Sequence, residues 1–383
     1  MSSLSLTNAR AVVVDEVERD GAIVVVDGRI VSVGSEAATG DEIDCSGLTL
    51  LPGFLDVHIH GAVGVDVNAA DVDGLVEVAR FLAQNGVTSW LPTLVPDSDE
   101  NYRRVISEID RLMDVQASEP VARAVGVHYE GVFANEKMCG ALRPQYFKKF
   151  CANELGELPR LESGVHMTTF APEVEGGIAL AGELQRQGWV ASIGHTKADI
   201  ETLDKAFAAG ARHVTHFFNA MTGMHHRDVG VVGWALTRPE VTFDIIADGI
   251  HVHPAMLEFA CRTKTPNRVS LISDAVAPVG LGDGEFQIWG ETVTVKSGRT
   301  QNERGSIAGS VITMRDAVNR MTSLGFSSPE VARMASLNPA TLLGIDAERG
   351  SLEVGKQADI VGLDADGKVR LTVIAGRVVH DNR

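Results

Sequence analysis

Residues 53–60, GFLDVHIH, join a short apolar run to two histidines spaced two residues apart. Side chains on a β-strand alternate between its two faces, so His58 and His60 are expected to share one face. The apolar residues around them predict a buried strand. Taken alone, the pair fits a metal site and two ordinary polar residues at a strand end equally well.

Seven further strand-like segments follow, and amphipathic stretches lie between them. This alternation predicts βα units and a parallel sheet. Eight such strands are the count of a (β/α)8 TIM-type barrel, so the expected class is α/β. The seven segments are TSWLPTL (88–94), AVGVHYEG (124–131), HMTTFAP (166–172), WVASIGHT (189–196), HVTHFFN (213–219), VTFDIIAD (241–248) and RVSLISDA (268–275).

Helices are expected between the strands, for example over residues 71–86, 100–115 and 196–210. The last of these begins at Thr196, a predicted N-cap, and stops at Gly210, a residue typical of helix C-termini.

Both ends of the chain differ from its middle. GAIVVVDGRIVSVG (21–34) and DGKVRLTVIAGRVVH (366–380) are β-branched runs with turn signals. We predict that residues 1–52 and 346–383 form a small β-sandwich domain built from both termini, and that residues 53–345 form the barrel.

The composition excludes several classes of function. With 34 Lys and Arg against 51 Asp and Glu, the net charge is −17, and no basic run is present. We therefore expect neither nucleic acid nor membrane as a partner. No stretch reaches the ~18 apolar residues of a spanning helix, and no secretory signal is visible. The four cysteines are scattered. This usage fits reduced thiols, so a cytoplasmic location is expected.

Imidazoles and carboxylates gather at the predicted strand ends, which form the catalytic face of such barrels. Glu130, His195, His216 and Asp274 each end a strand, as the His58 and His60 pair does. Each of them alone could be a capping or hydrogen-bonded residue. Together they have the composition of a site for zinc or another divalent transition metal.

Other polar residues are assigned less directly. Arg227, in a loop after the sixth strand, is suited to hold a phosphate or carboxylate, or else pairs with Asp228 or Glu240. His128 is expected to be a buried partner of the site. Of His213 and His216, one is expected to be structural, because three residues along a strand do not share a face.

The motifs resemble the amidohydrolase superfamily and, within it, the N-acetylglucosamine-6-phosphate deacetylases. The resemblance runs from about Gly53 to the C-terminus. It is carried by LPGFLDVHIHG (51–61), HYEGVF (128–133), SIGHT (192–196), HVTHFFNAM (213–221), HHRDVGVVGWAL (225–236), IADGIHVHP (246–254), LISDAVAPVGL (271–281), IAGSVITM (307–314) and MASLNPATLLG (334–344).

The resemblance implies roles for individual residues. Glu130, His195 and His216 match the ligands of one metal, and His58 and His60 match a pair that supports a second metal in some members. Asp274 matches the catalytic aspartate. Residues implied to bind substrate are Ala141, Asn219, Ala220, Arg227, His251 and Ile307.

The implied reaction is hydrolysis of the acetamide of N-acetylglucosamine-6-phosphate to glucosamine-6-phosphate and acetate. One or two divalent ions, zinc first among them, activate the water, and Asp274 acts as general base and then as general acid. The resemblance also implies a homodimer. Two alternatives stay open: another acylated amine such as N-acetylgalactosamine-6-phosphate, or a weakly active protein that binds amino-sugar phosphates.

The chain departs from the family pattern beside Glu130. The family usually has proline where this chain has Val132, and a substrate-contacting histidine where it has Leu142. This departure leaves the identity of the sugar and the efficiency of the reaction open. The loop that carries Cys139 and Leu142 is long and contains glycine, so we predict a mobile lid.

Overall fold

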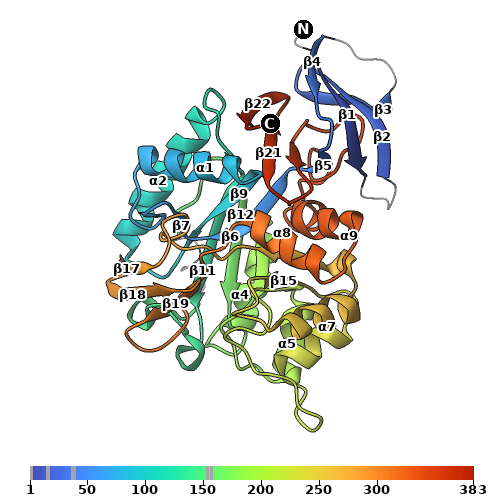
Figure 1. Ribbon diagram of the computed structural model, residues 1–383. Helices are drawn as coiled ribbons and strands as arrows, with labels where there is room; N and C mark the ends of the chain where they lie inside the picture. Colours follow the sequence, from blue (N-terminus) through green and yellow to red (C-terminus); the bar gives the residue numbers. More distant parts are fainter. Residues whose placement is uncertain (1–2, 14–17, 36–39, 152–154, 156–157) are drawn as a thin grey trace.

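The computed structural model describes residues 3–13, 18–35, 40–151, 155 and 158–383 (Figure 1). Its centre is a barrel of eight parallel strands that pair in chain order, so the predicted class is confirmed. Every strand lies within or overlaps a predicted segment. The strands are β6 (Phe54–Ile59), β9 (Val87–Leu94), β11 (Gly126–Phe133), β12 (Val165–Phe170), β13 (Val190–Ile193), β14 (His213–Val214), β15 (Thr242–Ile246) and β16 (Val269–Ile272).

The end of β16 closes the barrel against β6. Ile59 and Ala275 form a parallel bridge, and the amide of Asp274 donates a hydrogen bond of 2.9 Å to the carbonyl of His58. A second bond of 2.8 Å runs from the amide of His60 to the carbonyl of Ala275. Residues more than two hundred positions apart are thereby held side by side at the barrel mouth.

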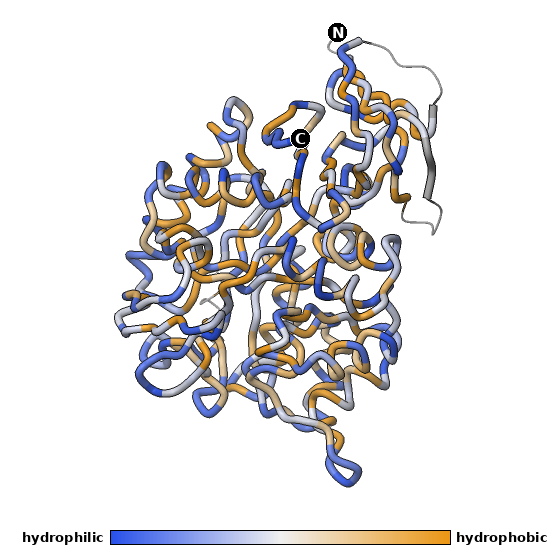
Figure 2. Tube along the Cα trace, in the orientation of Figure 1, coloured by the Kyte–Doolittle hydropathy of each residue, from blue (hydrophilic) through white to orange (hydrophobic). Residues whose placement is uncertain are grey.

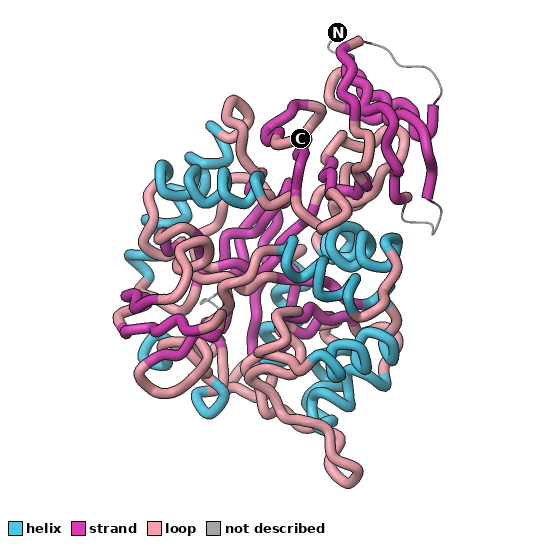
Figure 3. Tube along the Cα trace, in the orientation of Figure 1, coloured by secondary structure: helices cyan, strands magenta, loops and turns pink. Residues whose placement is uncertain are grey.

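Helices surround the barrel (Figure 3). The helices bury apolar side chains; α2, for example, buries Tyr102, Val105 and Ile109. Hydrophobic and hydrophilic residues alternate along these helices in Figure 2. The helices are α1 (Val72–Gln84), α2 (Asp99–Val115), α4 (Gly177–Arg186), α5 (Ile200–Ala208), α6 (Gly230–Thr237), α7 (Pro254–Lys264), α8 (Met314–Ser323), α9 (Ser328–Ala332) and α10 (Asn338–Leu342).

The predicted start of α5 was wrong by three residues. Asp199 is the N-cap, and its carboxylate accepts a hydrogen bond of 2.8 Å from the amide of Thr202. Thr196 lies outside the helix, because it forms a parallel bridge with Met221 before the first turn begins. Its hydroxyl donates to Glu173 at 2.5 Å and accepts from the amide of Ala198 at 3.0 Å. The predicted end is confirmed: Gly210 follows the helix with a φ of +114°.

The two ends of the chain combine, as predicted, and their strands form one mixed sheet. β20 pairs antiparallel with β5 and so joins the C-terminal strands to the N-terminal ones. The sheet has its own core, which includes Leu6, Ile23 and Leu371. Its strands are β1 (Ser3–Val12), β2 (Glu18–Val26), β3 (Arg29–Ser35), β4 (Asp41–Asp44), β5 (Thr49–Pro52), β20 (Ile360–Leu363), β21 (Val369–Ile374) and β22 (Arg377–Asp381). The division into domains after residues 52 and 345 stays a prediction.

A three-stranded antiparallel sheet that the sequence analysis did not anticipate lies between β16 and α8. It consists of β17 (Gly284–Ile288), β18 (Glu291–Lys296) and β19 (Arg299–Asn302). Val276, Ile288, Val293 and Ala308 form a small core beneath it. None of the helices in the described ranges is long and apolar enough to cross a membrane.

Arg349 connects the terminal sheet to the barrel. It donates hydrogen bonds to Ser89 of β9 at 2.5 Å and to Gln357 at 2.7 Å, and it lies 3.7 Å from the buried Asp359 carboxylate. Burial raises the pKa of Asp359, and the guanidiniums of Arg349 and Arg123 oppose that rise. The Arg349 contacts therefore offset part of the cost of burying this charge.

Arg349→Leu is expected to lower the free energy of unfolding by roughly 3 kcal/mol, because it leaves a buried carboxylate without its ion-pair partner. Urea denaturation measures the change. Arg29→Leu is the matched control, since the Arg29–Glu348 pair is about half exposed and is worth under about 1 kcal/mol. Equal effects of the two substitutions would contradict the interpretation.

Candidate metal centre and active site

One group of potential metal ligands forms at the carboxyl ends of β11, β13 and β14. Nε2 of His195 and Nε2 of His216 lie 3.0 and 3.1 Å from Oε1 of Glu130, and 3.1 Å from each other. All three side chains are buried. The strand order therefore brings together residues that are up to 86 positions apart.

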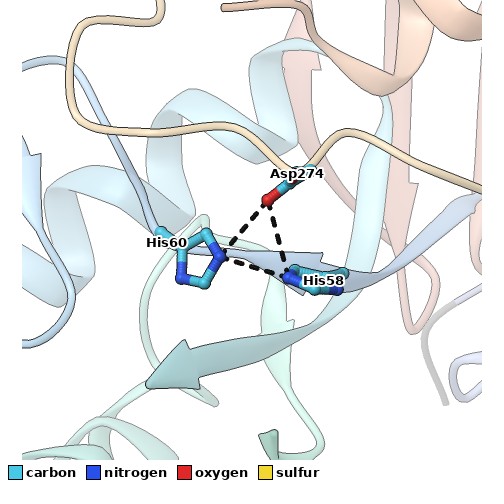
Figure 4. Close-up of side chains that lie close together, drawn as sticks. All are labelled: His58, His60 and Asp274. Atoms are coloured by element: carbon cyan, nitrogen blue, oxygen red, sulfur yellow. Dashed lines mark hydrogen bonds and ion pairs between the residues drawn. The ribbon is translucent and has the colours of Figure 1, made fainter. Parts of the chain in front are cut away.

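A second group forms where the barrel closes. His58 and His60 project from β6 and its end toward Asp274, which follows β16 (Figure 4). The two Nε2 atoms are 3.1 Å apart, and Oδ1 of Asp274 lies 3.5 Å from His58 and 3.2 Å from His60. These three side chains are buried as well.

Glu130 connects the two groups. Its Oε1 faces His195 and His216, and it also lies 3.5 Å from Nε2 of His58. Its Oε2 lies 3.2 Å from Nε2 of His60. A single carboxylate is thus shared by the four imidazoles of the two groups.

The spacing of these atoms fits a divalent metal ion. A tetrahedral ion with ligands at 2.0–2.1 Å has ligand-to-ligand distances of roughly 3.3 Å. The distances within the two groups run from 3.0 to 3.5 Å. Imidazole nitrogen with carboxylate oxygen is a donor set typical of zinc and its neighbours. Both groups are suited to hold such an ion.

The backbone conformation of three candidate ligands directs their side chains toward the barrel mouth. His195, His216 and Asp274 have φ values of +48°, +34° and +48°, a left-handed conformation that is costly for residues other than glycine. Each stands directly after its strand, so the turn directs the side chain across the barrel mouth. Strain of this kind in three of the six candidate ligands is typical of a functional site.

Two imidazoles are oriented by backbone carbonyls. Nδ1 of His195 donates to the carbonyl of Met138 at 2.7 Å, and Nδ1 of His60 donates to that of Thr93 at 3.2 Å. With the proton on Nδ1, the lone pair of Nε2 is free to coordinate a metal.

The carboxylates also determine the protonation of the metal-free site. Burial alone lowers the pKa of His60, but its hydrogen bonds to Asp274 and Glu130 raise it to about 10. The pKa of His216 rises to about 9 through Glu130, again against the effect of burial. Protons on these rings therefore compete with a metal ion for the same lone pairs.

A cavity of about 290 Å³ opens above the two groups. Its walls contain all but one of the residues implied to bind substrate: Ala141, Asn219, Ala220, His251 and Ile307. Glu130 and Asp274 face the same cavity, whereas His58 is fully buried behind it. Asp248 orients His251 by accepting a hydrogen bond of 2.6 Å from its Nδ1.

Arg227 does not line the cavity. It lies in an exposed loop, and its Nη1 is 2.8 Å from Nε2 of His226. Among the described residues its guanidinium pairs with neither Asp228 nor Glu240.

Two other histidines have structural surroundings. His213 lies between Thr242 and Asp244, at 2.7 and 3.1 Å, so it is the structural member of its pair. Both nitrogens of His128 are engaged, with the carbonyl of Val57 at 3.1 Å and Oγ1 of Thr169 at 2.7 Å. Its ring packs edge-on against His58, as expected for a buried partner of the site.

Trp289 also belongs to the site, although no motif in the sequence pointed to it. Its ring packs edge-on against His60 at a centroid distance of 5.1 Å, and it lines the cavity. Trp289 follows β17 in the unanticipated sheet, so no periodic pattern connected it with the barrel mouth. Leu142, the departure from the family pattern, lines the cavity too and is 3% exposed.

Comparison with known proteins agrees with this geometry. The family model described as the amidohydrolase family matches residues 49–379, and the chain belongs to this family. Within it, the chain is a member of the N-acetylglucosamine-6-phosphate deacetylases. The enzyme of that name from Bacillus subtilis (strain 168) is 34% identical over 390 residues, which cover 98% of this chain and 97% of the relative.

Two further comparisons bear on substrate and fold. An N-acetylgalactosamine-6-phosphate deacetylase of Escherichia coli O157:H7 is also 34% identical, over 92% of this chain and 93% of that protein. A mutant of the Mycobacterium smegmatis N-acetyl-D-glucosamine-6-phosphate deacetylase, with one aspartate replaced by alanine, was solved in complex with N-acetyl-D-glucosamine-6-phosphate. It matches with a TM-score of 0.90 and 30% identity, over 99% of this chain and all of that one.

His195→Asn is expected to lower the metal content of the purified protein by at least about tenfold, because it removes a candidate ligand of the Glu130 group. Elemental analysis after dialysis measures this. His166→Asn is the control, since His166 stacks on Trp189 away from the cavity. Wild-type metal content in His195→Asn would contradict the assignment.

The metal-free protein is expected to lose stability between about pH 7 and pH 10. His216 and His60 have pKa values of about 9 and 10 against an ordinary 6.5. A raised folded-state pKa contributes stability that is present below the unfolded value and is lost as the pH rises through the folded one. Urea midpoints of chelator-treated protein measure the loss, which His216→Asn should reduce. A urea midpoint that does not change between pH 7 and pH 10 would refute the prediction.

Proposed function

We propose that this protein hydrolyses the acetamide of N-acetylglucosamine-6-phosphate to glucosamine-6-phosphate and acetate. The observation that carries the proposal is the Glu130 carboxylate shared between two buried ligand groups, at the floor of a cavity whose walls contain Asn219, Ala220 and His251. The names of the full-length relatives support the same substrate class.

We further propose that the resident ion is zinc and that Glu130, His195 and His216 hold it. The donor set supports this choice. When bound, such an ion polarises a carbonyl oxygen and lowers the pKa of water toward ~7. A second ion at His58, His60 and Asp274 is compatible with the spacing of those side chains.

Asp274 is the proposed proton carrier. Burial alone raises its pKa, but His58 and His60 hold the value below the ordinary one. Asp274 is therefore a carboxylate at neutral pH, able to accept a proton from water. Its position in the cavity wall allows it to return that proton to the departing amine of a bound substrate.

Binding and orientation of the amino sugar are assigned to the cavity walls. Asp248 fixes the His251 ring, and a hydrogen bond of 3.2 Å from Asn219 Nδ2 to the carbonyl of His216 fixes the asparagine. Arg227, in an exposed loop outside the cavity walls, remains the proposed phosphate ligand, because its guanidinium forms no carboxylate pair among the described residues. A bound phosphate orients the acetamide for attack.

A second candidate substrate is N-acetylgalactosamine-6-phosphate. The relative that bears this name is as similar to the chain as the Bacillus subtilis enzyme is, at 34% identity. Leu142, in place of the usual histidine, keeps open the third alternative of a weakly active binding protein, since it replaces a polar contact in the cavity wall.

The protein is proposed to act in the cytoplasm as a homodimer. Met224 and Val229 support the dimer: both are exposed apolar residues, and both lie beside Gly233.

The metal-loaded protein is expected to release acetate from one or both phosphorylated sugars, and Asp274→Asn is expected to lower kcat at least about a hundredfold. Acetate release is measured from N-acetylglucosamine-6-phosphate, its galacto isomer and unphosphorylated N-acetylglucosamine. Metal analysis of the same samples is the control, because the Asp274 substitution leaves Glu130, His195 and His216 in place. Near wild-type turnover in Asp274→Asn would refute the role of that residue.

Metal-loaded wild-type protein that releases no acetate from any of the three sugars would refute the proposed reaction. Activity on the galacto isomer alone would select the second candidate substrate.

A further inference from the structure

The loop from Asn135 to Arg143 contacts one candidate ligand of the Glu130 group and packs against the residue next to another. The carbonyl of Met138 accepts the Nδ1 proton of His195 at 2.7 Å. At the other end of the loop, Leu142 lies over Gly131, the neighbour of Glu130. A Cβ on Gly131 would come within 2.3 Å of Leu142 Cδ1, so the two are in close contact. The position of this loop therefore bears on the orientation of the His195 ring and on the backbone next to Glu130.

One arginine attaches this loop to the three-stranded sheet. Nη2 of Arg304, in the turn after β19, donates to the carbonyls of Ala141 at 3.1 Å and Leu142 at 3.4 Å. Nε of the same guanidinium pairs with Oε1 of Glu291 on β18 at 2.9 Å. Glu291 fixes one edge of the guanidinium while another edge bridges two successive carbonyls of the loop.

Apolar packing supports the same attachment. Ala141 packs against the small core formed by Val276, Ile288, Val293 and Ala308. The same sheet also contacts the second ligand group, because Trp289, in the turn between β17 and β18, packs edge-on against His60. The three-stranded sheet thus touches the second ligand group directly through Trp289, and it reaches the first through Arg304 and the loop.

We infer that Arg304 is a positioning residue of the active site. It holds the backbone of Ala141 and Leu142 in place. As a result, the carbonyl of Met138 keeps Nε2 of His195 turned toward Glu130. Leu142 in turn stays packed over Gly131. The planar guanidinium is required, because a lysine ammonium is a single point donor that cannot bridge two carbonyls and Glu291 in one plane. The inference rests on the proposed function, since it treats the Glu130 group as a working metal site.

Zinc release to an excess of chelator tests this inference independently of the reaction. Arg304→Ala is expected to release zinc roughly tenfold faster than the wild type, as for other changes that disturb the orientation of a ligand. Arg304→Lys should restore only part of the difference, and Glu291→Gln should shift release in the same direction. Arg299→Ala is the matched control, because Arg299 is an exposed arginine on β19 of the same sheet.

Limited trypsin digestion provides a readout that needs no metal. Lys137 is exposed within the loop, and its cleavage reports how firmly the loop is held. Arg304→Ala is expected to speed cleavage at Lys137 several-fold, whereas Arg299→Ala should leave it unchanged. Mass spectrometry identifies the cut. If Arg304→Ala does not fold, Glu291→Gln and Arg304→Lys carry the same expectations.

Unchanged zinc release and unchanged Lys137 cleavage in a folded Arg304→Ala variant would overturn the inference. Failure of the proposed function has a different signature: wild-type protein that neither retains zinc nor releases acetate. In that case faster cleavage at Lys137 in Arg304→Ala would still show that the arginine holds the loop.

Discussion

The structure of the site depends on one buried carboxylate. Glu130 is 4% exposed and lies within 3.5 Å of Nε2 atoms from four histidines. A carboxylate buried in this way needs positive charge around it, which protonated imidazoles or metal ions provide. The left-handed turns at His195 and His216 are consistent with this requirement, because they direct both rings toward the same oxygen. The eight strands of the barrel provide the frame that holds these turns in place.

Much of this arrangement could be predicted from the sequence. Eight apolar segments indicated the strands, and the geometry of a parallel barrel then places their carboxyl ends at one mouth. His58, Glu130, His195 and Asp274 could be found for that reason. The N-cap of α5 could not, because Thr196 and Asp199 are both suitable capping residues. Only the structure shows that Thr196 pairs with Met221 before the helix begins.

The rest of the site depends on contacts that no local pattern encodes. Arg304 and Ala141 are 163 positions apart, and Trp289 comes from a hairpin whose alternation predicts strands but not their location. For Arg227, in contrast, the sequence suggested a place in the site that the structure does not show. Its residue type and its place after a barrel strand favoured a binding role, yet its side chain lies outside the cavity of its own chain. Position after a strand fixes the face of the barrel, but not the distance from its axis.

The closure of the barrel makes the second ligand group dependent on the order in which the chain is made. Asp274 reaches His58 and His60 only when the end of β16 bonds to β6, since the amide of Asp274 donates to the carbonyl of His58 itself. Glu130, His195 and His216 have already been added to the chain when the ribosome adds Asp274. The nascent chain therefore contains all the ligands of one metal group before the other group can exist. An intact His58–His60–Asp274 group is thus a marker of a completed barrel.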